Sequence, residues 1–120
     1  MTKIMKIGNI NIGPTFEPVI IAEIGINHNG SIEKAIKIAD SAIKSGARII
    51  KHQTHIAEDE MSLEAKKITP GNSTKNIYDL ISKCSLSEEN EFKLMKYIRY
   101  IKSSKLTEVL SIMQNLLKVF

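Results

Sequence analysis

The spacing of apolar and polar side chains divides the first half of the chain into a hairpin and two strands. Residues 3–13 alternate apolar and polar positions and contain two glycines, which predicts a short hairpin or a pair of edge strands. Residues 19–26 (VIIAEIGI) are rich in β-branched and apolar side chains, which is typical of a parallel strand buried on both faces. Residues 47–53 (ARIIKHQ) predict a second short strand.

A helix is predicted between the two strands. Ser31 is a favourable N-cap, and Glu33 suits the first turn. Gly46 suits the C-terminal end of the helix. One face of this helix is apolar and comprises Ile32, Ala35, Ile36, Ala39, Ala42 and Ile43. Strand, helix and strand in this order form a βαβ unit with a right-handed crossover, so the sequence predicts an α/β fold.

The second half of the chain predicts helices and loops. An acidic loop is expected at residues 58–60, and a short helix is expected at residues 76–83. Ser87 is an N-cap for a longer helix over residues 88–101. Apolar side chains recur at helical spacing in residues 106–120, which predicts an amphipathic helix. No pattern for a third strand follows the long helix.

The net charge of +4 is concentrated in the last quarter of the chain. Residues 1–92 hold 11 basic and 12 acidic side chains, whereas residues 93–120 hold six basic side chains and one acidic side chain. The basic side chains of residues 93–105 recur every third position with Tyr97 and Tyr100 between them, a pattern shared by nucleic-acid surfaces and solvated helix faces. Because the stripe has no recognisable binding motif, we favour the solvated face and expect no nucleic acid partner.

The sequence has neither a membrane span nor a secretory signal. Its longest apolar run is interrupted by Glu23 and is shorter than the roughly 20 residues that a span requires. The N-terminus lacks the apolar stretch and cleavage site of a signal peptide. Cys84 is the single cysteine, which excludes an intrachain disulfide and suits a reducing compartment. We therefore expect a cytoplasmic protein with no membrane partner.

Two charged residues are candidates for chemistry because each lies near the C-terminal end of a predicted strand. Active sites of open α/β sheets and of α/β barrels are built at this end. Neighbouring strands would bring Glu23 and Lys51 within reach of each other, either as a structural ion pair or as a functional pair. In the functional interpretation, Glu23 handles a proton and Lys51 binds an anionic substrate such as a phosphate.

The three histidines do not predict a metal site. His52 and His55 have an H-x-x-H spacing, but on a strand this spacing points the two rings to opposite faces. We expect His52 to pack towards the helix layer and His55 to lie in the following loop. His28 is expected to form a local hydrogen bond in its turn.

The segments around these residues resemble those of a known enzyme family. Residues 22–30 (AEIGINHNG) resemble the first barrel strand and turn of sialic acid synthases, and residues 49–62 (IIKHQTHIAEDEMS) resemble the second strand and loop. Together with AKK at residues 65–67 and PGN at residues 70–72, the pattern is most similar to bacterial N-acetylneuraminate synthases. The resemblance covers roughly residues 5–101, and long motifs in the same order are more specific than one short motif.

The resemblance implies the N-terminal portion of a (β/α)8 TIM barrel, which in the full-length family is followed by a small antifreeze-like domain in a domain-swapped homodimer. It implies an enzyme that condenses phosphoenolpyruvate with N-acetylmannosamine or a related bacterial amino sugar. The reaction releases phosphate and forms a nine-carbon sialic acid, and it requires Mn or Mg. The acceptor sugar stays open, since enzymes for different N-acetylated sugars share these early motifs.

The same resemblance assigns roles to four residues. Glu23 matches a carboxylate near the reacting carbons, which is implicated in handling a proton or water. Lys51 matches a lysine that contacts phosphoenolpyruvate. Gln53 and Asn72 match residues that contact the acceptor sugar. The metal-binding histidines of the family come from later strands, and no histidine of this chain matches them.

The chain departs from the family pattern at Ile101, where the family continues with a glycine, a third strand and a Ser-Thr-Pro-Phe-like motif. We therefore expect an incomplete barrel domain at residues 1–101, truncated after about two βα units, and an off-pattern amphipathic helical tail at residues 102–120. Such a chain alone is expected to be catalytically silent and to bind no metal well. The alternative is a non-enzymatic interaction or complementation fragment that docks through its basic and apolar C-terminal helices.

Overall fold

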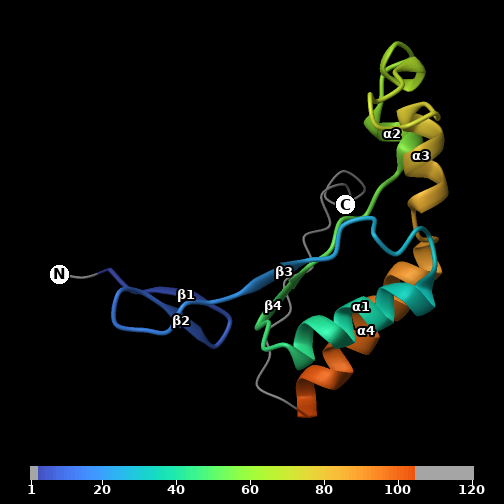
Figure 1. The fold of residues 1–120 in the computed structure, drawn as a ribbon. Helices are drawn as coiled ribbons and strands as arrows, with labels where there is room; N and C mark the ends of the chain where they lie inside the picture. Colours follow the sequence, from blue (N-terminus) through green and yellow to red (C-terminus); the bar gives the residue numbers. More distant parts are fainter. Residues whose placement is uncertain (1–2, 105–120) are drawn as a thin grey trace.

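The computed structural model describes residues 3–104, with side chains as far as Ile101 (Figure 1). In chain order the elements are β1 (Met5–Ile7), β2 (Ile10–Ile12), β3 (Ile21–Glu23), α1 (Ile32–Lys44), β4 (Ile49–Lys51), α2 (Ala57–Glu60), the 3-10 turn η1 (Ala65–Lys67), α3 (Ile77–Cys84) and α4 (Glu88–Ser104). The helix predicted at residues 106–120 lies outside the described residues. Within the described part, none of the helices has the length and apolar character needed to cross a membrane.

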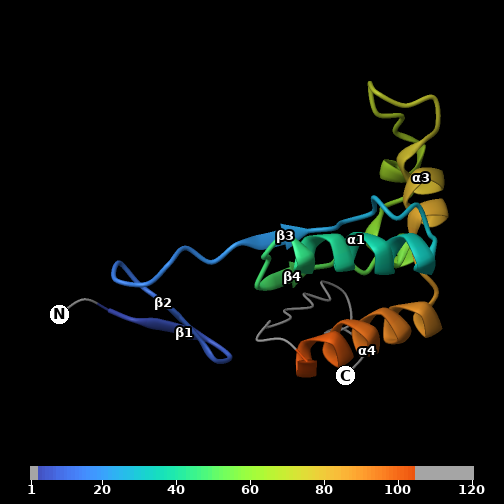
Figure 2. The ribbon, with the colours of Figure 1, turned by 60° about the horizontal axis from the view of Figure 1, so that its bottom comes forward.

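β1 and β2 form the predicted N-terminal hairpin. They pair antiparallel, with Met5 opposite Ile12 and Ile7 opposite Ile10. The connecting turn places Gly8 at φ +56°, a left-handed conformation that glycine adopts without steric cost. Figures 1 and 2 both show the hairpin as an arm that lies away from the helices.

β3, α1 and β4 form the predicted βαβ unit. The two strands pair in parallel, with Glu23 opposite Lys51. α1 begins as expected after Ser31, whose hydroxyl accepts a hydrogen bond from the Lys34 N–H. The chain leaves α1 through Gly46 at φ +94°, as predicted for a C-terminal glycine.

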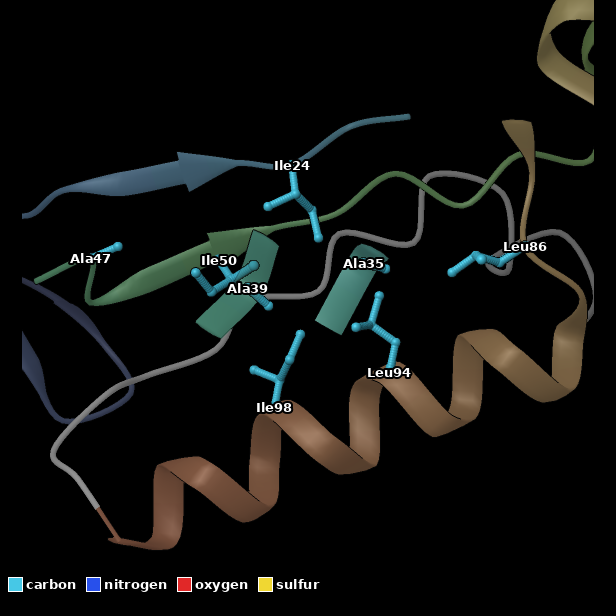
Figure 3. Packing of buried hydrophobic residues seen from close by; sticks show 8 residues of the cluster. All are labelled: Ile24, Ala35, Ala39, Ala47, Ile50, Leu86, Leu94 and Ile98. Carbon is cyan, nitrogen blue, oxygen red and sulfur yellow. The ribbon is translucent and has the colours of Figure 1, made fainter. Parts of the chain in front are cut away.

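The core lies between one face of the β3–β4 sheet and the two long helices. Its buried cluster comprises eight apolar side chains: Ile24, Ala35, Ala39, Ala47, Ile50, Leu86, Leu94 and Ile98. Figure 3 shows Leu94 and Ile98 of α4 pointing towards the small side chains of α1. The predicted apolar face of α1 is confirmed, because all six of its residues belong to this cluster or pack against it.

A polar contact also joins α1 to α4. The Tyr97 hydroxyl donates to the Asp40 carboxylate at 3.0 Å, and this hydrogen bond raises the pKa of Tyr97. Tyr97 therefore contributes to the packing of α4 on α1.

The expectation that the first long strand is buried on both faces is wrong. β3 covers only Ile21–Glu23, and the side chains of Ile20 and Ile21 are 58% and 51% exposed. α1 and α4 pack on one face of the sheet, so the described helices cover that face alone (Figure 2). The strand segment therefore carries more apolar side chains than the described residues bury.

The acidic segment at residues 58–60 is not a loop as expected, because it forms most of α2. The Glu60 carboxylate accepts a hydrogen bond from the Ile56 N–H at 2.8 Å, which satisfies a backbone donor at the start of this short helix. The helices predicted at residues 76–83 and 88–101 are confirmed as α3 and α4. Their predicted starts also hold, since Asn76 caps α3 and the Ser87 hydroxyl accepts from the Asn90 N–H.

Candidate functional site

Glu23 and Lys51 meet at the C-terminal ends of β3 and β4. The strand register places them opposite each other, and Lys51 Nζ lies 2.9 Å from Glu23 Oε1, so the predicted proximity is confirmed. The Lys51 side chain is 32% exposed and the Glu23 side chain is 67% exposed. A solvated ion pair of this kind contributes about 0–1 kcal/mol to stability, so stability alone gives little reason for the pair.

Gln53 follows β4, two residues after Lys51, and reaches across to the neighbouring chain segment. A Cβ placed on Gly25 would lie 3.6 Å from Gln53 Oε1, so the amide rests against the backbone of Gly25. Gly25 has φ +46°, a conformation that side chains disfavour. Gln53 therefore lies beside Gly25, which follows Glu23 by two residues in the chain.

Among the described residues, no hydrogen bond or ion pair joins Asn72 to Glu23, Lys51 or Gln53. It is exposed in the turn between η1 and α3. Figures 1 and 2 show the segment from α2 to α3 beyond the C-terminal ends of β3 and β4, which is the end that carries Glu23 and Lys51. The segment that carries Asn72 thus lies beyond the strand ends that carry Glu23 and Lys51, and the described hydrogen bonds do not complete a four-residue site.

The segment that carries Asn72 is held at its base by three side chains. The Tyr78 hydroxyl donates to Glu58 at 2.6 Å, and Lys66 donates to the same carboxylate. These two hydrogen bonds hold the pKa of Glu58 below its ordinary value. Lys66 Nζ also lies 4.9 Å from the centre of the Tyr78 ring, which is cation–π geometry. The contacts tie α2, η1 and α3 into one unit.

His52 packs towards the helix layer as predicted, where it meets a partner that sequence reasoning missed. His52 Nε2 lies 2.8 Å from Glu91 Oε2 in the first turn of α4, and Thr54 Oγ1 donates to the same oxygen at 3.1 Å. All three side chains are buried. An acid in a first turn is favoured by the helix dipole alone, so no separate sequence signal identifies Glu91 as the partner of His52.

His28 forms the expected local hydrogen bond, since its Nδ1 accepts from the Gly30 N–H at 3.1 Å. Its ring is 1% exposed and lies 5.5 Å from the His52 ring, centre to centre. Burial, and secondarily repulsion from His52, lowers the pKa of His28. The residue belongs to the packing beneath the turn that connects β3 to α1.

The histidines are bound to carboxylates or to backbone rather than grouped around a common point. His55 follows β4 as expected, and its Nδ1 lies 2.9 Å from Glu60 Oε2. Among the residues that the structure describes, no three His, Cys, Asp or Glu side chains are close enough to hold a metal ion together. The described residues therefore do not fit a divalent metal centre of their own.

The sequence comparisons place this geometry in context. The model of the NeuB family matches residues 38–111. The uncharacterized protein MJ1065 of Methanocaldococcus jannaschii is 36% identical over 97 residues, which are 81% of this chain and 26% of that protein. The N,N'-diacetyllegionaminic acid synthase of Legionella pneumophila is 33% identical over 88 residues, which are 68% of this chain and 24% of that protein.

A solved structure has the same fold over almost the whole chain. The N-acetylneuraminic acid synthetase of Leptospira borgpetersenii matches with a TM-score of 0.71 and 21% sequence identity, over 99% of this chain and 37% of that one. At this identity the match shows the fold alone. The chain spans about a quarter of the length of the two relatives above, 26% and 24%.

Proposed function

The chain belongs to the NeuB family, and from this membership we propose that it supplies the N-terminal part of the active site of a sialic acid-type synthase. The proposed reaction condenses phosphoenolpyruvate with N-acetylmannosamine or a related bacterial amino sugar. Its product is a nine-carbon acid made for carbohydrate biosynthesis. The name of the Legionella relative adds diacetamido sugars to the acceptors that are worth testing.

The Glu23–Lys51 pair is the observation that carries this proposal. Lys51 Nζ lies 2.9 Å from Glu23 Oε1 at the C-terminal ends of two parallel strands. We assign Lys51 to the anionic groups of phosphoenolpyruvate, because an ammonium group binds phosphate as a point charge. An anion that contacts Lys51 competes with Glu23 for the ammonium group. We assign the Glu23 carboxylate, released in this way, to handling a proton or a water molecule.

Gln53 and Asn72 are assigned to the acceptor sugar. The Gln53 amide rests against Gly25 and has no hydrogen-bond partner among the described residues, so both its donor and its acceptor are available to a hydroxyl or acetamido group. Asn72 is exposed in the turn before α3, at the same end of the sheet.

The full-length family is expected to use Mn or Mg, and the described residues offer no set of ligands for such an ion. We therefore derive no step of this chain's chemistry through a metal. The proposal is confined to binding and proton handling by Glu23, Lys51, Gln53 and Asn72. The chain alone is accordingly proposed to be catalytically silent.

Two assays test the proposal. The purified 120-residue chain is incubated with phosphoenolpyruvate, Mn and either N-acetylmannosamine or a diacetamido sugar, and phosphate release is measured. We expect no release above background. In the second assay, residues 5–101 replace the matching segment of the Legionella synthase, and the chimera is expected to form product.

The chimera then separates the roles of the paired residues. Glu23→Gln is expected to lower kcat by roughly a hundredfold or more, because general acid–base catalysis contributes at least that much. Lys51→Met is expected to raise the KM for phosphoenolpyruvate by roughly tenfold to a hundredfold, because it removes a charged hydrogen bond. Lys75→Met, at an exposed lysine with no side-chain ion pair among the described residues, is the matched control. An active chimera that tolerates both changes would refute the assignments.

The open face of the sheet favours the second candidate, a fragment that associates with another polypeptide. Ile20 and Ile21 are 58% and 51% exposed, and each strand of the β3–β4 sheet pairs with a single neighbour among the described residues. A polypeptide that supplies further strands would cover this surface. Mixing the chain with the remaining part of the Legionella synthase tests this idea, and recovery of activity is the supporting result. Absence of a complex in that mixture counts against it.

A further inference from the structure

The segment that carries Gln53 lies beyond the last hydrogen bond between the two strands. The ladder ends where the Ile24 N–H donates to the Lys51 carbonyl at 3.0 Å. For residues 52–54, no backbone hydrogen bond to any other described residue is present. The hydrogen bonds of the sheet therefore do not hold Gln53 in place.

A single carboxylate oxygen holds the residues on both sides of Gln53. Glu91 Oε2 lies 2.8 Å from His52 Nε2 and 3.1 Å from Thr54 Oγ1. The Thr54 hydroxyl donates to this oxygen, and His52 donates to it in the tautomer that carries its proton on Nε2. His52, Thr54 and Glu91 are 4%, 6% and 8% exposed, so water competes little for these bonds.

The neighbouring contacts transmit this restraint to Gln53. His52 and Thr54 both reach Glu91 Oε2, whereas the side chain of Gln53 between them reaches the segment that follows β3. There, Gln53 Oε1 lies against Gly25. Removing the carboxylate leaves residues 52–54 with no hydrogen bond to another described segment.

We propose that Glu91 is a positioning residue for Gln53, acting through His52 and Thr54. The inference rests on the proposed function, in which the Gln53 amide contacts the acceptor sugar. Glu91 touches no proposed substrate and lies in the first turn of α4, where the helix dipole favours a carboxylate. Through Glu91, α4 helps to shape the sugar site in addition to covering the core.

The test uses the full 120-residue chain and nuclear magnetic resonance, so that it does not depend on catalysis. The readouts are the nuclear Overhauser effect between the Gln53 side-chain amide and the Gly25 α-protons, and the ¹⁵N shifts of the His52 ring. The variants are Glu91→Ala, Glu91→Gln and Thr54→Val. Glu88→Ala is the matched control, because Glu88 is an exposed acid in the same turn.

Glu91→Ala is expected to weaken the Gln53–Gly25 signal by tenfold or more, because it removes both bonds. Thr54→Val removes one bond in a side chain of similar shape and is expected to shift the docked population of Gln53 by roughly fivefold. Glu91→Gln keeps an acceptor oxygen and is expected to restore most of the signal, whereas Glu88→Ala leaves it unchanged. In the original chain, the His52 shifts are expected to place the proton on Nε2.

An undiminished Gln53–Gly25 signal in folded Glu91→Ala or in Thr54→Val would overturn the proposal. If Glu91→Ala fails to fold, Thr54→Val decides alone, since it removes only one hydroxyl. Titration with N-acetylmannosamine separates this inference from the proposed function. If the original chain shows the Glu91-dependent signal and no shift with the sugar, the positioning role stands and the sugar assignment fails.

Discussion

His28 is a buried side chain whose charging is opposed by its surroundings. Burial, followed by repulsion from His52, holds its pKa below the ordinary value of 6.5, and the nearby Glu91 carboxylate opposes this shift only in part. As the pH falls below 6.5, the unfolded chain binds a proton that the folded chain does not bind. We therefore expect the free energy of unfolding to decrease between about pH 7.5 and about pH 5.5, as measured by urea denaturation.

The matched variant for this prediction is His28→Asn. Asparagine offers an acceptor oxygen near the position of the histidine Nδ1, so the hydrogen bond from the Gly30 N–H can be retained. Asparagine does not titrate, and the variant is expected to show a shallower loss of stability over the same pH range. An equal pH dependence in both proteins would assign the effect to other groups.

Particular residues show what the sequence could and could not predict about the site. The Glu23–Lys51 contact could be predicted, because strand alternation and parallel register together place both residues at one end of the sheet. The interaction of His52 with Glu91 joins residues 39 positions apart. No local pattern specifies which helix turn will face a strand, so this partner required the packed structure.

At the scale of single elements, α1 depends on its N-terminal cap. The Ser31 hydroxyl accepts a hydrogen bond from the Lys34 N–H, and α1 carries the apolar face that covers the sheet. Ser31→Ala is expected to lower the free energy of unfolding by about 1 kcal/mol, measured by urea denaturation. Ser41→Ala is the control, because the Ser41 hydroxyl only donates to the Lys37 carbonyl within the helix. A larger loss for Ser41→Ala would contradict the capping argument.

β3 shows why element-level prediction stops short of the observed burial. Its apolar sequence predicts a strand covered on both faces; the strand and its parallel pairing are present, but Ile21 is exposed. Coverage of the second face depends on what other segments lie there, which the sequence of the strand does not encode. The acidic segment at residues 58–60 also lacks a local signal for a helix. The hydrogen bond from the Ile56 N–H to the Glu60 carboxylate forms only once the turn has closed.

At the scale of the whole molecule, the exposed isoleucines predict self-association. Ile21 is 51% exposed beside a strand edge that no other described strand pairs with, and exposed apolar surface of this kind promotes contacts between molecules. Ile21→Thr keeps a β-branched side chain and is expected to shift sedimentation towards the monomer at high concentration. Ile68→Thr is the control, since Ile68 is 59% exposed but lies outside the sheet. An equal effect of both changes would show that the sheet face is not the contact.

The fold as a whole was predictable as far as local patterns reach. The hairpin, the βαβ unit and the starts of α1, α3 and α4 all follow from alternation, helical spacing and caps. The packing of α4 on α1 does not follow in this way, because it joins Tyr97 to Asp40 across 57 residues. The resemblance of residues 22–30 and 49–62 to sialic acid synthases also predicts the family correctly, since the NeuB family model matches residues 38–111.

The long sequence separation of the α4 contacts also has a consequence for the order of folding. The strands β3 and β4 join residues 28 positions apart, whereas α4 reaches back 39 residues to His52 and 57 residues to Asp40. Because contacts between distant residues form against a larger loss of chain entropy, we expect the βαβ unit to assemble first and α4 to dock late. A substitution of Glu91 is then expected to increase the unfolding rate and to leave the folding rate nearly unchanged.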